Sequence, residues 1–140
     1  MTPVDQEFIH GPDNGLIGDC QRAVIASLLD LDISEVPHFL KIAMERDGTH
    51  GGYWDDLQLW LGARGFAWLE VASGSALWGT REFGVYHEIA GPSPRGNGTW
   101  HAVVGCDGVI VFDPHPSRAG LAGDPSEWKF SYLVGLGRKP

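Results

Sequence analysis

The sequence predicts an α+β fold in which N-terminal helices pack on a mostly antiparallel C-terminal sheet. Apolar residues in the first half recur at helical spacing. The second half instead holds short runs rich in β-branched and aromatic residues, separated by Gly, Pro, Ser and Asp. Because no helical pattern lies between these runs, their strands are expected to pair antiparallel beneath the helices. The chain has 140 residues, so we expect a single domain over residues 1–140.

The first predicted helix is apolar on nearly every side and begins with a cysteine. It runs from about Gly18 or Asp19 to about Asp30, with Asp19 as N-cap. Between Cys20 and Leu31 only Arg22 and Asp30 are charged. A helix without a polar face belongs inside a protein. Cys20 lies where first-turn N–H groups and the helix dipole favour an anion, which lowers a thiol pKa. The neighbouring Asp19 carboxylate opposes this effect.

The remaining elements follow from spacing and from turn residues. A short helical turn is expected over residues 31–37. A second helix begins near Val36 and stops at Gly48, and a third runs from Tyr53 to Gly65. Strands are expected over residues 66–71, 84–90, 100–106, 109–113 and 128–136.

Composition and charge limit the possible partners. The net charge is −8 and only ten residues are Lys or Arg, which argues against nucleic-acid binding and slightly favours neutral or cationic substrates. The N-terminus lacks a signal-peptide pattern and no apolar run is long enough to span a bilayer. We therefore expect a cytoplasmic protein without a membrane partner, in which Cys20 and Cys106 are free thiols. The sequence indicates no cofactor and does not define an oligomeric state.

A histidine and an aspartate flank a predicted hairpin. His101 begins one strand, the chain turns near Asp107 and Gly108, and the return strand ends at Asp113. A two-residue turn would place His101 opposite Pro114. A three-residue turn with a bulge would place it opposite Asp113, on the same face. We favour the three-residue form because it sets a carboxylate beside the imidazole.

Together with the helix-start cysteine, this pair supplies what nucleophilic acyl chemistry needs. The imidazole takes the thiol proton, the thiolate attacks a carbonyl, and the carboxylate orients the ring. If these three side chains are not in contact, Cys20 is a small buried hydrophobe, His101 is an ordinary sheet-edge histidine and Asp113 is the start of a turn. His87 is a second candidate base. Cys106 is the weaker candidate nucleophile because it lies at a turn.

The order of these residues resembles a known family. The matching segments are residues 18–20, 101–105 and 111–114. A cysteine on a helix, a histidine beginning a later strand and Asp-Pro ending the next strand resemble the papain-like cysteine peptidase superfamily. The closest similarity is to its compact bacterial branch, which includes the double-glycine leader peptidases of bacteriocin exporters.

That resemblance implies a papain-like fold and a triad of Cys20, His101 and Asp113. The superfamily commonly places an oxyanion-hole glutamine six positions before the cysteine, where this chain has Asn14. The Asn14 amide can still donate a hydrogen bond, and the Cys20 backbone N–H can supply the other.

Several further residues are candidates to contact substrate: His50, Trp54, Trp100, His115 and Ser117. The leading hypothesis is a thiol-dependent hydrolase or acyltransferase acting on a peptide, protein, isopeptide or small amide. One alternative is a binding module that keeps the fold and the cleft but has little or no catalytic activity. Another is a zinc-dependent hydrolase using Cys20, His101, Asp113 or His115, although the chain lacks paired short ligand spacings and we predict no metal site.

Overall fold

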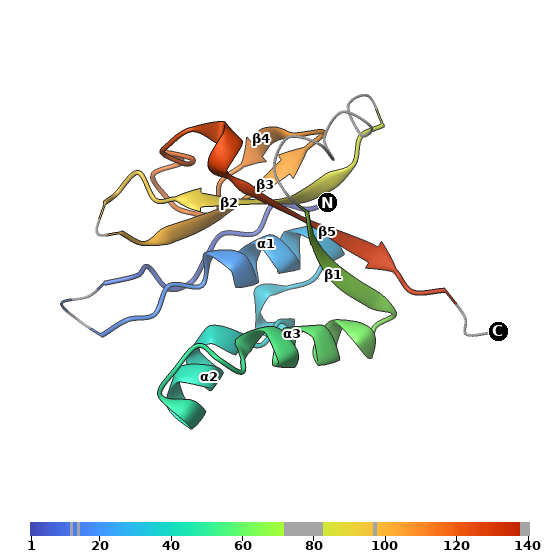
Figure 1. The fold of residues 1–140 in the computed structure, drawn as a ribbon, viewed down its shortest axis with the longest axis horizontal. Helices are drawn as coiled ribbons and strands as arrows, with labels where there is room; N and C mark the ends of the chain where they lie inside the picture. The colour runs from blue at the N-terminus through green and yellow to red at the C-terminus, as the bar shows by residue number, and fades with distance from the viewer. Residues whose placement is uncertain (12, 14, 72–82, 97, 138–140) are drawn as a thin grey trace.

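The structure, a computed structural model, describes residues 1–11, 13, 15–71, 83–96 and 98–137. Over these residues it contains three α-helices followed by a five-stranded antiparallel sheet (Figure 1). The predicted α+β class and the antiparallel pairing are therefore confirmed. No helix in the described ranges combines the length and apolar character needed to cross a bilayer.

The elements lie close to their expected positions. The helices are α1 (Cys20–Leu29), the 3-10 turn η1 (Ile33–Glu35), α2 (Phe39–Asp47) and α3 (Tyr53–Gly62). The strands are β1 (Phe66–Val71), β2 (Tyr86–Pro92), β3 (Trp100–Cys106), β4 (Val109–Phe112) and β5 (Lys129–Gly135), with the 3-10 turn η3 (Pro125–Glu127) before β5. The second helix begins at Phe39 rather than Val36. Its first turn is capped by His38, whose Nδ1 accepts a hydrogen bond from the Lys41 N–H.

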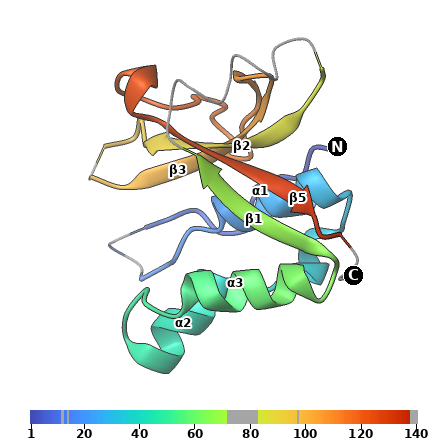
Figure 2. The same ribbon diagram turned by 45° about the vertical axis from the view of Figure 1, so that its right-hand side comes forward.

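The sheet order is β1-β5-β2-β3-β4, so the C-terminal strand β5 lies between β1 and β2. The two views of the ribbon show α1 between this sheet and the α2–α3 pair (Figures 1 and 2). Helix α1 is therefore covered on two sides, and every residue from Ala23 to Ser27 is buried. This confirms the prediction of a central buried helix.

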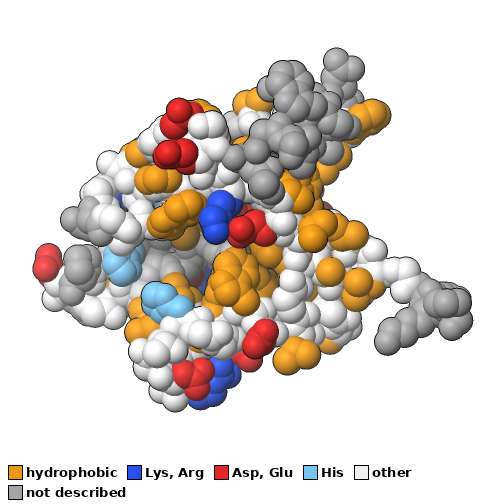
Figure 3. Space-filling view, viewed as in Figure 1, with side chains coloured by type: hydrophobic (Ala, Val, Ile, Leu, Met, Phe, Trp, Pro, Cys, Tyr) orange, Lys and Arg blue, Asp and Glu red, His pale blue; other side chains and the backbone are white. Residues whose placement is uncertain are grey.

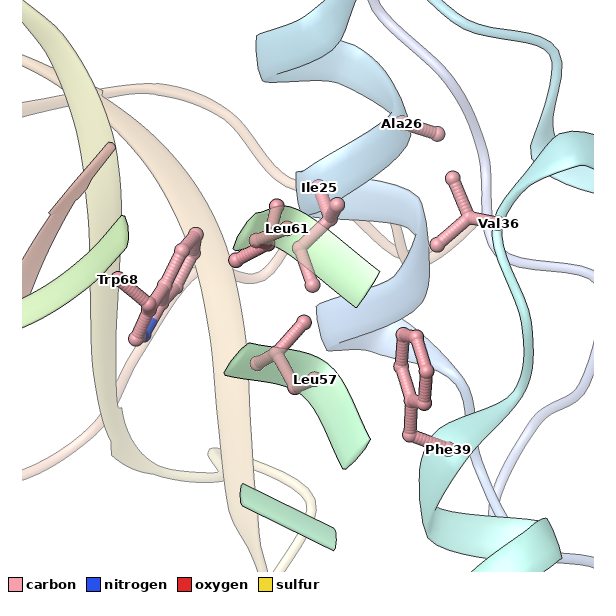
Figure 4. Close-up of a cluster of buried hydrophobic side chains, with 7 residues drawn as sticks. All are labelled: Ile25, Ala26, Val36, Phe39, Leu57, Leu61 and Trp68. Atoms are coloured by element: carbon pink, nitrogen blue, oxygen red, sulfur yellow. The ribbon is translucent and has the colours of Figure 1, made fainter. Parts of the chain in front are cut away.

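Two apolar clusters hold α1 in place. On one side Val24 packs with Ala102 and Val104 of β3. On the other side Ile25 and Ala26 join a cluster contributed by the chain before α2, by α2, by α3 and by β1 (Figure 4). That second cluster comprises Ile25, Ala26, Val36, Phe39, Leu57, Leu61 and Trp68.

The β3–β4 hairpin follows the alternative two-residue register next to its turn and departs from both predicted registers beyond Gly105. Its turn has two residues, because Cys106 pairs with Val109 and both intervening residues have positive φ: 49° at Asp107 and 83° at Gly108. Such a pair is typical of a type I′ turn. The register then shifts by one residue, since Gly105 pairs with Ile110 but Val104 pairs with Phe112. The favoured three-residue turn is therefore wrong, and a bulge further along the hairpin sets where β4 ends.

The α1–α3 packing generates a stability prediction. Leu57 is fully buried, whereas Leu59 on the same helix is 74% exposed. Leu57→Ala should lower the free energy of unfolding by about 2–5 kcal/mol through lost burial and cavity formation. The matched control Leu59→Ala should change it by less than about 0.5 kcal/mol. Urea unfolding of the two variants measures the difference, and equal losses would contradict the assigned packing.

Candidate active site

His101 and Asp113 form a buried pair at the end of the sheet. His101 Nε2 lies 2.7 Å from Asp113 Oδ1, and the two residues are 4% and 5% exposed. His101 is the second residue of β3, and Asp113 directly follows β4. The predicted contact between the Asp113 carboxylate and the His101 imidazole is confirmed. The hairpin brings the two side chains together with a bulge rather than with the predicted three-residue turn.

The Asp113 carboxylate is held by further hydrogen bonds. Its Oδ1 accepts from the His115 N–H at 2.8 Å, and its Oδ2 accepts from the Gly120 N–H at 2.7 Å. Burial alone raises the pKa of Asp113, but the hydrogen bonds from His101 and these two amides outweigh it, so the pKa lies below its usual range. Asp113 is therefore ionised at neutral pH.

Burial has the opposite consequence for the imidazole. Desolvation lowers the pKa of His101 more than the hydrogen bond and charge of Asp113 raise it. The ring is therefore neutral at neutral pH, and an ionised Asp113 requires Nε2 to carry the proton. The other ring nitrogen, Nδ1, is left with a lone pair that can accept a proton.

Cys20 begins α1, but its neighbour Asp19 does not cap the helix with its side chain. Asp19 is 2% exposed, and its carboxylate accepts hydrogen bonds from the backbone N–H of Phe8 at 2.8 Å and of Glu7 at 3.4 Å. It also forms an ion pair with Arg22 at 3.1 Å. Asp19 is therefore the N-cap residue by position, as predicted, and its carbonyl accepts from the Ala23 N–H at 3.1 Å. Its carboxylate does not cap the helix but ties the N-terminal segment to the start of α1.

The Cys20 thiol is less acidic than the helix-start argument predicts. Burial raises the pKa of Cys20 to about 11, although the N–H groups of Ala102 and Gln21 hydrogen-bond the sulfur and oppose that rise. The charges of Glu88 and Asp19 raise it further. The expectation of a depressed thiol pKa is therefore wrong for this environment. The contact with Ala102 places the sulfur against β3 at the residue after His101.

A buried carboxyl that sequence reasoning missed lies near the thiol. Glu88 of β2 is 2% exposed; Gln21 Nε2 donates to its Oε1 at 3.5 Å, and its Oε2 has no hydrogen-bond partner among the described residues. Burial raises the pKa of Glu88 to about 8. Burial also raises the pKa of Tyr53, and the charges of Glu88 and Cys20 add to that rise, so the three groups are within electrostatic reach of one another. The sequence signal was a carboxylate within a predicted strand.

Cys20 and His101 line one cleft of about 590 Å³. Three of the residues predicted to contact substrate line it as well: His50, Trp100 and His115. On the face in Figure 3, histidine side chains lie beside a hollow between the sheet and the helices.

The other predicted contacts fall elsewhere. Ser117 lies behind His115, with its Oγ 2.8 Å from His115 Nδ1. Trp54 does not line the cleft; it is 46% exposed and makes an edge contact with Tyr53. Asn14 lies outside the described residues.

An apolar part of the cleft wall was not predicted. It is formed largely by apolar side chains from two segments distant in sequence: Ile9, Ile17, Leu40 and Met44. Gly18 also lines the cleft, and a Cβ at this position would lie 3.0 Å from His10 Cβ. The close approach of Gly18 to His10 therefore depends on glycine.

The alternative base and nucleophile are placed outside this cleft. His87 is fully buried, accepts a hydrogen bond from the Gly108 N–H at 3.0 Å and packs against Phe130 and Tyr132. It therefore stabilises the hairpin. Cys106 is partly buried at the β3–β4 turn, and desolvation followed by the charge of Asp107 raises its thiol pKa.

The part of the chain that the structure describes contains no group of three or more His, Cys, Asp or Glu arranged to hold a metal ion. Comparisons of the chain with protein-family models, curated proteins and solved structures gave no match.

Glu88 generates a prediction for stability against pH. Its folded pKa is raised to about 8 from an ordinary 4.5, so between these values the folded chain binds more protons than the unfolded chain. Wild-type stability should therefore fall with rising pH relative to Glu88→Gln, by up to about 1.4 kcal/mol per pH unit. Urea unfolding across this range measures the slope.

A matched control is Glu45→Gln, which removes a carboxylate whose side chain is 65% exposed on α2. This variant should follow the wild-type pH profile. Parallel profiles for wild type and Glu88→Gln would contradict the buried, protonated state of Glu88.

Proposed function

We propose that the protein is a thiol-dependent hydrolase or acyltransferase that acts on amide bonds of peptides, proteins or small molecules through Cys20. The observation that carries this proposal is the buried His101–Asp113 hydrogen bond of 2.7 Å, formed by a histidine that lines the same cleft as the helix-start thiol. A neutral imidazole oriented by a carboxylate, beside a thiol in an open cleft, is the arrangement that nucleophilic acyl transfer requires.

The steps follow from the protonation states of the three groups. His101 Nδ1 accepts the Cys20 proton as the sulfur attacks the substrate carbonyl carbon. The tetrahedral intermediate collapses to a thioester, and the leaving amine takes the proton from His101. Water or an acceptor amine, deprotonated by His101, then attacks the thioester carbonyl. The Cys20 sulfur leaves and takes the proton back from His101. The Cys20 N–H, in the unpaired first turn of α1, is a donor for the oxyanion.

The proposal includes a papain-like architecture. It is supported by the order of a helix-start cysteine, a histidine at the start of a strand and an aspartate after the next strand, and by helices that precede an antiparallel sheet. In the resemblance to papain-like peptidases, Asn14 would complete the oxyanion hole as a second donor.

The first test is removal of the nucleophile. Cys20→Ala should abolish turnover of fluorogenic peptide amides and alkylation by iodoacetamide at this position, because the attacking atom is gone. The matched control Cys106→Ala removes the other thiol and should retain both activities. Peptide mass spectrometry locates the alkylated residue, and unchanged turnover in Cys20→Ala would reject the proposal.

The second test removes the charge that orients the base. Asp113→Asn leaves a side chain of the same shape that no longer fixes the Nε2–H form of His101. The rate of Cys20 alkylation at neutral pH should fall by about tenfold or more. Circular dichroism establishes that the variant is folded. A folded variant with the wild-type rate would show that Asp113 does not support the base.

A second candidate function is a binding module with the same cleft, and the raised thiol pKa of about 11 favours it. The two functions differ in how Cys20 alkylation depends on pH. A thiol activated by His101 should react at a nearly constant rate through neutral pH, with an acid limb below the usual histidine pKa because the pKa of His101 is lowered by burial. An unassisted thiol should react about tenfold faster per pH unit through the same range, as its thiolate fraction rises.

A further inference from the structure

The cleft differs in charge from the chain as a whole. The chain carries a net charge of −8, yet none of the described residues lining the cleft is Asp or Glu. The ionisable groups of its wall, besides Cys20, are Arg95 and four histidines: His10, His50, His101 and His115. A local surface of this kind suits a group of negative charge.

Arg95 is the permanent cation of this wall, and within the described part of the chain no carboxylate pairs with it. Among the described residues Arg95 forms no ion pair, whereas three other arginines each contact a carboxylate: Arg22, Arg46 and Arg118. Its Nη1 instead donates a hydrogen bond to Ser117 Oγ at 3.2 Å. A guanidinium has five N–H donors in a planar fork, so most of them remain for a ligand.

The position of Arg95 relates it to the reacting groups. Ser117 Oγ also contacts His115 Nδ1 at 2.8 Å, and the His115 ring meets the His101 ring edge to face with centroids 6.1 Å apart. Burial is the main cause of the lowered pKa of His101, and the charge of Arg95 adds to it. The guanidinium is thus within electrostatic reach of the candidate base.

We propose that the cleft binds amide substrates that carry a carboxylate near the scissile carbonyl, and that Arg95 binds this carboxylate. The inference rests on the proposed function of Cys20. A planar guanidinium pairs with a carboxylate through two parallel N–H···O bonds, and the apolar wall of Ile9, Ile17, Leu40 and Met44 is available for the uncharged part of the substrate. The negative charge of the whole chain slightly favoured neutral or cationic substrates. The described cleft lining has the opposite sign, because it contains Arg95 and no carboxylate.

Two alkylating reagents of almost equal size test the inference, because iodoacetate carries a carboxylate where iodoacetamide carries a neutral amide. With either reagent the sulfur displaces iodide and forms the same thioether bond. Cys106 lies outside the cleft and serves as a reference in the same chain. Because the charge of Asp107 beside it also disfavours the anionic reagent, the deciding comparison is the ratio at Cys20 itself with and without the charge of Arg95. We expect the iodoacetate-to-iodoacetamide rate ratio at Cys20 to exceed the ratio at Cys106 by about fivefold or more, because a nearby cation attracts the anionic reagent.

Variants at two arginines identify the cation responsible. Arg95→Gln should reduce the Cys20 ratio to that of Cys106, whereas Arg95→Lys should keep part of the excess. The matched control Arg64→Gln removes the same charge from a residue that stacks on Trp60 away from the cleft, and it should leave the ratio unchanged. Because each value is a ratio of two rates at one thiol, a general change in Cys20 reactivity cancels.

Equal ratios at Cys20 and Cys106, or an excess that survives in Arg95→Gln, would overturn the inference and leave the proposed function intact. Failure of the proposed function has a different signature. In that case Cys20 would react with iodoacetamide no faster than Cys106, and the inference would fall with it.

Discussion

The burial of α1 on two sides is the constraint on which the rest of the structure depends. Val24 is fixed against β3, while Ile25 and Ala26 are fixed against the cluster of α2, α3 and β1. With both sides packed, the helix cannot turn about its axis without breaking close contacts. Its first residue, Cys20, is thereby held against the start of β3, where His101 stands.

The same burial determines the chemistry of the thiol. A helix N-terminus stabilises an anion by only about 0.3–1 kcal/mol at an exposed position, which is less than the cost of desolvating a thiolate at the partly buried position of Cys20. Hence the pKa of Cys20 rises even though two backbone N–H groups donate to the sulfur. With the pKa of His101 lowered as well, the resting pair is a neutral thiol and a neutral imidazole. Catalysis by such a pair requires proton transfer during attack on the carbonyl.

Residues that follow a local pattern could be predicted, and residues defined by distant contacts could not. Spacing placed α1 and β3 within a residue or two of their observed bounds. The predicted contact between His101 and Asp113 is present, although the turn chosen to reach it was not the observed one. The favoured three-residue turn was wrong because residues 107–108 form the alternative two-residue turn. The bulge between the Gly105–Ile110 and Val104–Phe112 pairs, which no local turn residue marks, then shifts the register again. Glu88 was missed because its environment is created by Gln21 on another element.

Arg95 shows why a whole-chain property cannot describe a site. Charges on the surface are screened over about 8–10 Å at physiological salt, so the net charge of −8 affects the approach of a charged molecule more than its contacts once bound. Within the cleft the nearest ionisable groups have the larger effect on a bound molecule. These groups are a guanidinium without a carboxylate partner among the described residues and the side chains of several histidines. The acidic side chains that give the chain its charge do not line this surface where the structure describes it. We therefore expect any substrate preference at Cys20 to depend on the guanidinium of Arg95, which the fold places in the cleft, rather than on the composition of the whole chain.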